Sequence, residues 1–384
     1  MTLPAWLAQP EKRFQVATRL LLAAAMVWGL LRTVRSVTML FGVSHDLGIY
    51  QSLWFLLMHR EFADIALGQA LYLPHTWLVL TPLFLLGWPV TKVLMLLLNV
   101  ASVFYIWWRL AQLAGLDGIR RWLLLAFLWS WLPTGLVIGL GNLALVCVAA
   151  VLAAYPFSSV TNSVWLTLSA MKHSLVFPIY FQLLFKRPKV LILPFVVITF
   201  CGLAALFWAR LGLADILPLA KGLNATVESW TRTDITSLRR LFRPALGDTI
   251  ALSAVVWACW FGLYALVARR VRDPLAQLAA LLLLSLLPIY HQQYDLVAAA
   301  PTLALFLKRG SLVWPVTMTL LLAVNLVSAP TYLLPSGLLR NAADALLTVY
   351  TPLLVLALLG RIIWLETRSP SNLLPSLSPQ TVPD

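Results

Sequence analysis

The chain has 384 residues, of which 61% are hydrophobic and only 11% are charged, and its mean hydropathy is +0.87. A water-soluble protein of this length does not carry so much apolar sequence, so the composition indicates a polytopic helical membrane protein. Lys and Arg (28) outnumber Asp and Glu (14), which gives a net charge of +14. The basic residues lie in short runs between apolar segments, as in cytoplasmic loops, so we expect no nucleic-acid partner.

Apolar windows of about 20 residues predict an all-α bundle of about twelve spans. These windows lie near residues 15–35, 74–88, 90–109, 120–137, 142–157, 162–184, 188–210, 249–267, 274–290, 294–307, 311–328 and 342–361. With a cytoplasmic N-terminus, the basic loops 186–189, 269–272 and 308–309 all lie inside. The prediction is therefore N-in and C-in, with the longer connections 36–73, 110–119 and 211–248 outside.

The domain organisation is predicted to be simple. Residues 1–368 form one transmembrane domain that begins with a retained signal anchor. Residues 369–384 are rich in Ser and Pro and read as a disordered cytoplasmic tail. All three cysteines lie in apolar runs, so we expect no disulfide, no metal ion and no cofactor.

A lone acidic residue, Asp46, follows the first apolar segment. A carboxylate beside the bilayer is costly, which favours a chemical role. Tyr50 lies one turn later and shares its face if the loop is helical. Residues 51–58 are amphipathic and are expected to lie along the membrane surface. Asp117 and Asp295 are the other expected outer carboxylates near span ends; Asp117 lies between glycines, where a structural turn is favoured.

Polar residues also interrupt the sixth apolar segment. Lys172 and His173 lie near the middle of the run 164–185. A lysine at this depth cannot easily reach the interface, and inserting it costs roughly 2.5–3.5 kcal/mol. Lys172 must therefore face a cavity or a counter-charge, and a structural salt bridge inside the bundle is the alternative to a functional site.

Two connections gather further hydrogen-bonding groups. Asn142 ends a Gly-x-Gly-Asn sequence, which is an ordinary tight turn or part of a site. Tyr290, His291 and Asp295 lie in a polar stretch between two apolar segments. Such a combination exceeds what a simple turn needs, which favours a site.

A short surface helix is predicted over residues 234–247. Asp234 or Thr236 would begin it, and Pro244 with Gly247 would end it. Its basic face would hold Arg239, Arg240 and Arg243, and its apolar face, with Leu238, Leu241 and Phe242, would point to the membrane. Arginines in an outer loop indicate either attraction to anionic lipids or a site for a phosphate-bearing lipid.

The order of these features resembles the GT-C glycosyltransferases, and among them the polyprenol-phosphate-mannose-dependent mannosyltransferases of family 87. The motifs matched are an Asp-x-x-x-Tyr loop, an aromatic-Pro helix entry, a Gly-Gln-x-Asn turn, a Lys-Pro pair, a Ser-Leu before a basic helix, and a late His-containing loop. They correspond here to Asp46 with Tyr50, Tyr72-Leu73-Pro74, Gly139-Leu140-Gly141-Asn142, Lys172-His173, Ser237-Leu238-Arg239-Arg240 and 290–295. The resemblance covers roughly residues 40–305. The turn lacks the family's glutamine, and His173 replaces its proline.

The resemblance implies transfer of a sugar, mannose or another hexose, from a polyprenyl-phosphate donor to a lipid- or glycan-linked acceptor. The reaction would occur with inversion on the outer side of the cytoplasmic membrane, among membrane lipids, with Asp46 as the general base. The donor phosphate would contact Lys172, His291, Arg239, Arg240 and Arg243. The other substrate-binding residues would be Tyr50, Asn142, His173, Tyr290 and Asp295.

Three other readings stay open. A secondary transporter would use Lys172 and Asp295 as ion-coupling groups, although the two halves of the sequence show no convincing repeat. A flippase or ligase for lipid-linked glycans would share the arginines but would not need a base at Asp46. A non-catalytic assembly subunit is the fourth option. The variant Asp46→Asn distinguishes the glycosyltransferase from these alternatives, because a glycosyltransferase should lose turnover while the protein folds normally.

Overall fold

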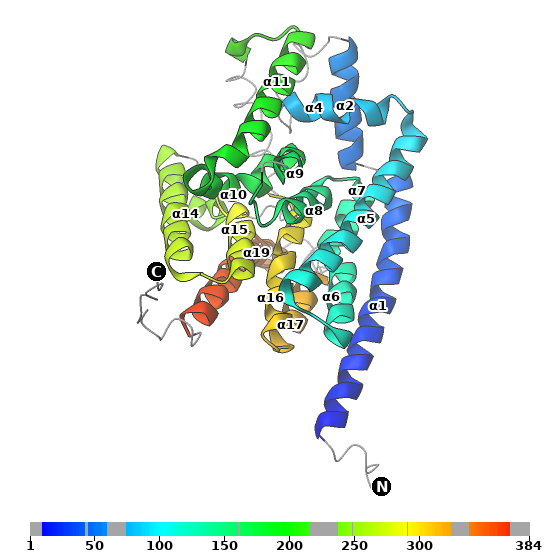
Figure 1. Cartoon of the computed structure of the whole chain (residues 1–384), viewed down its shortest axis with the longest axis vertical. Helices are drawn as coiled ribbons and strands as arrows, with labels where there is room; N and C mark the ends of the chain where they lie inside the picture. The colour runs from blue at the N-terminus through cyan, green and yellow to red at the C-terminus, as the bar shows by residue number, and fades with distance from the viewer. Residues whose placement is uncertain are drawn as a thin grey trace, which may run out of the picture.

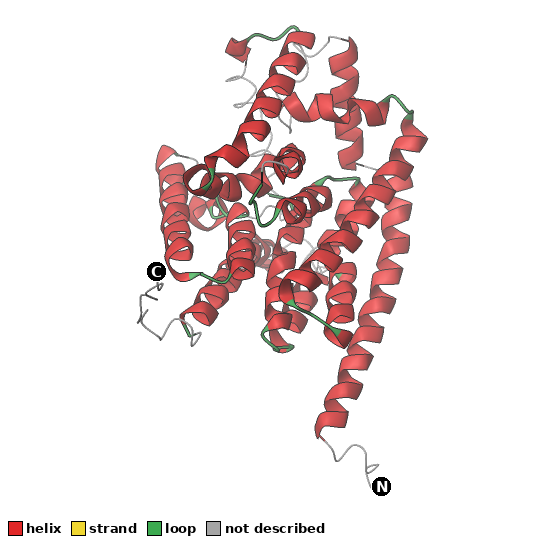
Figure 2. Cartoon of the chain, viewed as in Figure 1, coloured by secondary structure: helices red, strands yellow, loops and turns green. Residues whose placement is uncertain are grey.

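A computed structural model describes residues 10–42, 45–59, 74–159, 162–215, 237–247, 249–289, 291–323 and 338–368. Within these ranges every regular element is a helix, which confirms the predicted all-α fold (Figure 2). The helices of the first part are α1 (Pro10–Gly42), α2 (His45–His59), α4 (Pro74–Phe84), α5 (Trp88–Ala114), α6 (Gly118–Ser130), α7 (Leu132–Leu140) and α8 (Ala144–Ala154).

The second part continues with α9 (Ser163–Ser169), α10 (His173–Lys186), α11 (Ile192–Trp208), α13 (Arg239–Leu246), α14 (Ile250–Arg270), α15 (Pro274–Ser285), α16 (Ala300–Lys308), α17 (Val313–Ala323) and α19 (Leu338–Thr367). The short 3₁₀ helices are η3 (Ala170–Lys172), η4 (Pro188–Leu191), η5 (Leu213–Asp215) and η6 (Gln293–Ala299). In Figure 1, α1 runs along one edge of the molecule, and α2, α4 and the end of α11 lie at the end away from the N-terminus.

Five helical segments among the described residues are long and apolar enough to cross a membrane. They are Gln15–His59, Trp88–Ala114, Pro188–Trp208, Ile250–Arg270 and Val349–Thr367. The pair α6 and α7, bent by 55° at Trp131, makes a sixth if it counts as one span. The protein is therefore a helical membrane protein, as its composition predicts.

The structure does not reproduce the expected twelve spans. Several predicted spans form helices of only 9 to 12 residues, including α8, α15 and α16. A 12-residue helix is about 18 Å long, well short of the roughly 30 Å hydrocarbon core. Almost every residue of α15 and α16 is buried among other helices. An apolar run that packs against protein has the same composition as one that faces lipid, so the sequence window counted both.

The predicted topology also needs correction at residues 110–119. These residues join α5 to α6, and they were expected on the opposite side from residues 308–309. A guanidinium nitrogen of Arg120 lies 3.7 Å from the point where a Cβ on Gly310 would stand. The α5–α6 connection and the α16–α17 connection therefore lie at the same end of the molecule, so residues 110–119 and 308–309 cannot lie on opposite sides as predicted.

The core is centred on α15, η6 and α16, with α5 to α8, α10, α14 and α19 around them (Figure 1). Trp260 of α14 is 1% exposed, and its indole N–H donates to the carbonyl of Leu284 over 3.0 Å. This bond fixes the last turn of α15, where the chain turns toward the polar residues described next.

Candidate functional site

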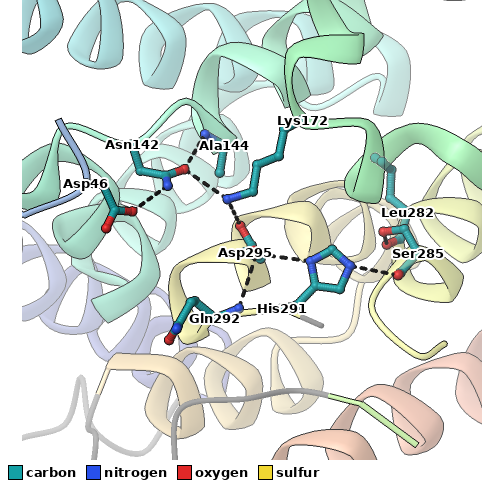
Figure 3. A network of polar contacts seen from close by, with 9 residues as sticks. All are labelled: Asp46, Asn142, Ala144, Lys172, Leu282, Ser285, His291, Gln292 and Asp295. Carbon is teal, nitrogen blue, oxygen red and sulfur yellow. Dashed lines mark hydrogen bonds and ion pairs between the residues drawn. The ribbon is translucent and has the colours of Figure 1, made fainter. Parts of the chain in front are cut away.

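A chain of polar side chains crosses the interior of the bundle (Figure 3). It joins Asp46 in the first turn of α2, Asn142 at the break between α7 and α8, Lys172 at the end of η3, and Asp295 with His291 at the start of η6. None of the five is more than 6% exposed. The structure thus brings together five of the predicted site residues from four separate parts of the sequence.

Asn142 lies at the centre of the first half of this network. Its amide nitrogen donates to Oδ2 of Asp46 over 2.6 Å. Its amide oxygen accepts from Nζ of Lys172 at 3.1 Å and from the backbone N–H of Ala144 at 2.8 Å. These bonds fix the orientation of the amide, because the nitrogen must face the carboxylate and the oxygen must face the cation. Asn142 therefore couples the position of Asp46 to that of Lys172.

Asp295 lies at the centre of the second half. Its Oδ1 is 2.6 Å from Nζ of Lys172, and its Oδ2 is 3.0 Å from Nδ1 of His291. The other imidazole nitrogen, Nε2, lies 2.9 Å from the carbonyl oxygen of Ser285. Both ring nitrogens of His291 therefore face oxygen atoms, one on a carboxylate and one on a backbone carbonyl, which fixes the plane of the imidazole. The network thus joins two carboxyl groups, Asp46 and Asp295, through Asn142 and Lys172.

A glycine allows Asp46 and Asn142 to meet. Gly141 ends α7 in the left-handed region, with φ of +69°, and its N–H together with that of Asn142 caps the last carbonyls of α7. A Cβ at this position would stand 2.8 Å from Cβ of Leu47, the neighbour of Asp46. Only glycine therefore permits both the turn and the close approach of α2.

Two residues of α4 hold the segment that carries Lys172. A ring nitrogen of His75 lies 3.1 Å from the carbonyl oxygen of Ala170, and the Thr76 hydroxyl donates to the carbonyl of Met171 over 3.2 Å. Both side chains are buried. They satisfy carbonyls that the change from α9 to η3 leaves outside regular helix bonding, and so fix Lys172 in place. Sequence reasoning missed them, although a His-Thr pair at the start of an apolar run is a usable signal.

A capping box holds Asp295. The backbone N–H of Gln292 donates to its Oδ2 over 3.2 Å, at the start of η6. The ammonium of Lys172 also lies 4.5 Å from the ring centroid of Tyr294, within the range of a cation–π contact. These roles of Gln292 and Tyr294 were not predicted, because they depend on the conformation of the 291–295 turn.

The surroundings of Asp46 differ from the prediction. Asp46 lies in helix α2, not in an outer loop, and Tyr50 is in the next turn of the same helix and only 3% exposed. Leu53 and Leu57 are buried in a cluster with Trp77 and α11, so the segment 51–58 does not simply lie along a membrane surface. The packing of α2 against α4 and α11 is the reason.

The basic helix forms as α13 (Arg239–Leu246), and Gly247 ends it with φ of +62°. Asp234 and Thr236 lie outside the described residues; Pro244 is inside the helix and does not end it. The predicted direction of the apolar face is wrong. Leu238 is 2% exposed in the main core, and Leu241 and Phe242 pack against that core, because the start of α13 is bonded to the bundle.

That bond places α13 close to the polar network. The backbone N–H of Leu238 donates to the carbonyl of Leu287 over 2.8 Å, and the Ser237 hydroxyl donates to the same oxygen over 3.3 Å. Leu287 belongs to the connection between Ser285 and His291. The half-buried side chains of Arg239, Arg240 and Arg243 are thus carried on a helix tethered to the loop that ends in His291.

The remaining predicted residues have different outcomes. Lys172 has Asp295 as a counter-charge, so the arrangement favours the structural salt-bridge reading over an open phosphate contact. His173 begins α10, is half-buried and lies beside the network without joining it. Tyr290 lies outside the described residues.

The chemistry available at this site is that of acids, bases and hydrogen bonds. Among the described residues, no group of three or more His, Cys, Asp or Glu side chains is placed to hold a metal ion. The three cysteines, Cys147, Cys201 and Cys259, are free thiols. What the network offers is an oriented carboxylate at one end, and a lysine and an imidazole held by a second carboxylate at the other.

Comparisons with family models, with curated proteins and with solved structures each found no match to this chain. The assignment of a function therefore rests on the site and on the sequence motifs alone.

Proposed function

We propose that this protein is an inverting membrane glycosyltransferase that transfers a sugar, mannose or another hexose, from a polyprenyl-phosphate donor to a lipid- or glycan-linked acceptor. The observation that carries the proposal is the buried Asp46 carboxylate held by Asn142, which is itself held by Lys172. An oriented carboxylate at the edge of a membrane bundle is suited to general-base catalysis. The order of motifs that resembles the GT-C family adds to this support.

In the proposed reaction the acceptor hydroxyl oxygen attacks the anomeric carbon of the sugar. Asp46 takes the hydroxyl proton, and the bond from the anomeric carbon to the phosphate oxygen breaks on the opposite face. The electron pair leaves with the lipid monophosphate, whose developing charge needs cations. Arg239, Arg240 and Arg243 on α13 are the proposed phosphate contacts, because α13 begins beside the His291 loop.

The proposed role of Lys172 and His291 follows from their burial. Both already have Asp295 as a partner, and neither is more than 6% exposed. We assign them to positioning: Lys172 holds Asn142, and Asn142 holds the base. A direct contact of either with the phosphate requires the pair with Asp295 to open when the donor binds.

The proposed sidedness puts the basic end of the molecule in the cytoplasm, with the active site on the outer side of the cytoplasmic membrane. This sidedness follows from the positive-inside rule, by which short loops rich in Lys and Arg lie in the cytoplasm. The loops 186–189, 269–272 and 308–309 are short and basic. Reporter fusions after Arg187 and Arg270 are expected to read cytoplasmic. A fusion at Gly115 is expected to read the same side as one at Gly310, and opposite readings at these two would contradict the arrangement of α5 and α6 described above.

The test of the function is the variant Asp46→Asn in purified protein, reconstituted with a polyprenyl-phosphate hexose and a membrane-extract acceptor. Product glycans are measured by mass spectrometry. Loss of general-base catalysis is expected to lower turnover on the order of 10²–10⁴-fold, with unchanged expression and thermal stability. Asp117→Asn, at the other end of the molecule, is the matched control and should retain activity.

A different base is indicated if Asp46→Asn stays active while Asp295→Asn is inactive. If both variants form as much product as the wild type, the enzyme proposal itself fails.

A secondary transporter is the second candidate, and one observation favours it. The ion pair of Lys172 and Asp295 is buried where helices are interrupted, at the breaks after Leu140 and around η3. Discontinuous helices around buried charges are typical of ion-coupled transport. In reconstituted vesicles a transporter would lose solute flux with Asp295→Asn and keep it with Asp46→Asn, which is the reverse of the enzyme pattern.

A further inference from the structure

A cavity of about 290 Å³ lies at the basic end of the molecule, away from the polar network. The turn after α8, the last turns of α10 and the first turns of α15 enclose it. It shares this end with Asp273 and Lys308, because Pro274, which lines it, follows Asp273 directly.

The walls of the cavity divide into an apolar part and a basic part. Ile179, Leu183, Leu278 and Leu281 form the apolar part, and each is no more than 5% exposed. The exposed residues Lys186 and Arg187 form the basic part. None of the described lining residues is acidic. The cavity therefore combines positive charge at its rim with a hydrocarbon interior, which matches an anionic amphiphile.

The basic rim is held in place by the backbone. Nη1 of Arg187 donates to the carbonyls of Pro156, over 3.2 Å, and Phe157, over 3.0 Å. Among the described residues, its Nε and Nη2 groups make no further hydrogen bond, so part of the guanidinium fork is available to an anion. Asp273, which directly precedes the lining residue Pro274, is already bonded to Lys308 and to the N–H of Ala276.

The outer surface beside the rim is apolar. Leu184 and Phe185, which directly precede Lys186, are 48% and 70% exposed. On a membrane protein such side chains face acyl chains. A ligand whose phosphate meets Lys186 and Arg187 would thus find hydrocarbon both in the cavity and along this surface. The volume of the cavity suits a glycerophosphate group with the first part of one chain, near the lower limit of about 300 Å³ for ligand sites.

We propose that this cavity is a binding site for an anionic phospholipid of the cytoplasmic leaflet. Its phosphate is held by Lys186 and Arg187, and part of one acyl chain enters between α10 and α15. Basic pockets between membrane helices on the cytoplasmic side are suited to anionic headgroups.

The test is native mass spectrometry of the full chain after equilibration in vesicles of equal parts phosphatidylglycerol and phosphatidylcholine. The wild type is expected to retain phosphatidylglycerol in preference to phosphatidylcholine. A basic residue near the membrane surface contributes about 1 kcal/mol, so Lys186→Gln is expected to lower retention by about fivefold. Lys189→Gln is the matched control, because Lys189 is exposed in the same loop but does not line the cavity.

A second variant avoids any effect of the rim residues on folding. Gln277→Trp fills the cavity from the α15 side and leaves Lys186 and Arg187 intact, and it is expected to abolish retention. Equal losses for Lys189→Gln and Lys186→Gln would overturn the site in favour of a diffuse basic surface. Displacement of the lipid by inorganic phosphate would overturn it in favour of a soluble anion, and equal retention of both lipids would show that charge is not recognised.

Discussion

Two charged regions lie at opposite ends of the same two core helices. Helix α15 begins at the Asp273 cap and ends at Ser285, whose carbonyl meets His291. Helix α16 follows η6, which carries Asp295, and ends at Lys308. The basic-end clamp consists of the pairs Asp273–Lys308 (2.9 Å) and Glu366–Arg309 (2.6 Å). The other region is the polar network around the Lys172–Asp295 pair, whose ions are 2.6 Å apart.

The N–O distances of the ion pairs are similar in the clamp and in the network. The two regions differ in how far their charged side chains are exposed. In the clamp the side chains of Lys308 and Arg309 are 36% and 31% exposed, so water screens both cations. In the network the side chains of Lys172 and Asp295 are 7% and 3% exposed. Removing ions from water costs several kcal/mol each, which the pair must offset by its geometry. The clamp caps and joins helices at a partly exposed end, whereas the network keeps its charges at a desolvation cost that only their mutual pairing offsets.

The largest effect on stability is expected from breaking the buried pair. Lys172→Ala leaves the buried Asp295 without the ammonium of Lys172, and it should lower the free energy of unfolding by about 3–5 kcal/mol. Thermal unfolding in detergent measures this. Lys308→Ala, in the clamp, is the control and should cost no more than about 1 kcal/mol. Equal losses in the two variants would remove the distinction between the regions.

A smaller effect is expected at the turn that brings α2 to the network. Gly141→Ala forces a Cβ against Leu47 at positive φ, which together should cost about 2–4 kcal/mol. Gly115→Ala is the matched control. Gly115 also has positive φ, +62°, but a Cβ there would meet nothing within 4 Å. The difference between the two variants in thermal unfolding isolates the contact with α2, and no difference would show that α2 can move away freely.

In the clamp, the strongest effect is expected at its most buried member. Glu366 is 3% exposed and accepts from Arg309 and from the backbone N–H groups of Arg272 and Asp273. Glu366→Gln should lower stability by about 1–2 kcal/mol, discounted because Arg309 is partly exposed. Asp117→Asn should change it by no more than about 0.5 kcal/mol, since Asp117 makes no side-chain cap bond. A larger loss at Asp117 would argue against this ranking.

The smallest effect is a pH dependence of the clamp. Burial, the largest influence on Asp273, raises the pKa of its carboxyl, but the bonds from Lys308 and Ala276 and the nearby charges more than offset it. The folded pKa therefore lies below the unfolded value of about 4. The stabilisation is present above the unfolded pKa and is lost as pH falls through the folded pKa. Unfolding followed below about pH 4 should show it in the wild type, and Asp273→Asn should remove that part of the acid sensitivity.

Much of the fold class and part of the site follow from composition and local pattern. A high apolar content with few charges predicts membrane helices, because such residues cannot stay exposed to water. Polar residues within or beside apolar runs, such as Asn142, Lys172 and Asp295, can be identified as site candidates from the sequence, because each must find a partner when buried. Likewise, three arginines spaced to share one face of a helix predict a short helix over residues 234–247, which the structure confirms over Arg239–Leu246.

The contact partners of the polar side chains, and the burial of each apolar segment, were decided only by the tertiary structure. Asn142 and Asp46 are 96 positions apart, and no local periodicity indicates that their helices meet. Whether an apolar run spans the membrane or packs inside the bundle depends on its neighbours. The sequence therefore predicted that the segments of α15 and α16 span the membrane, and that the apolar face of α13 points to lipid. Hydrophobicity sets what must be kept from water, but long-range packing sets what each segment is buried against.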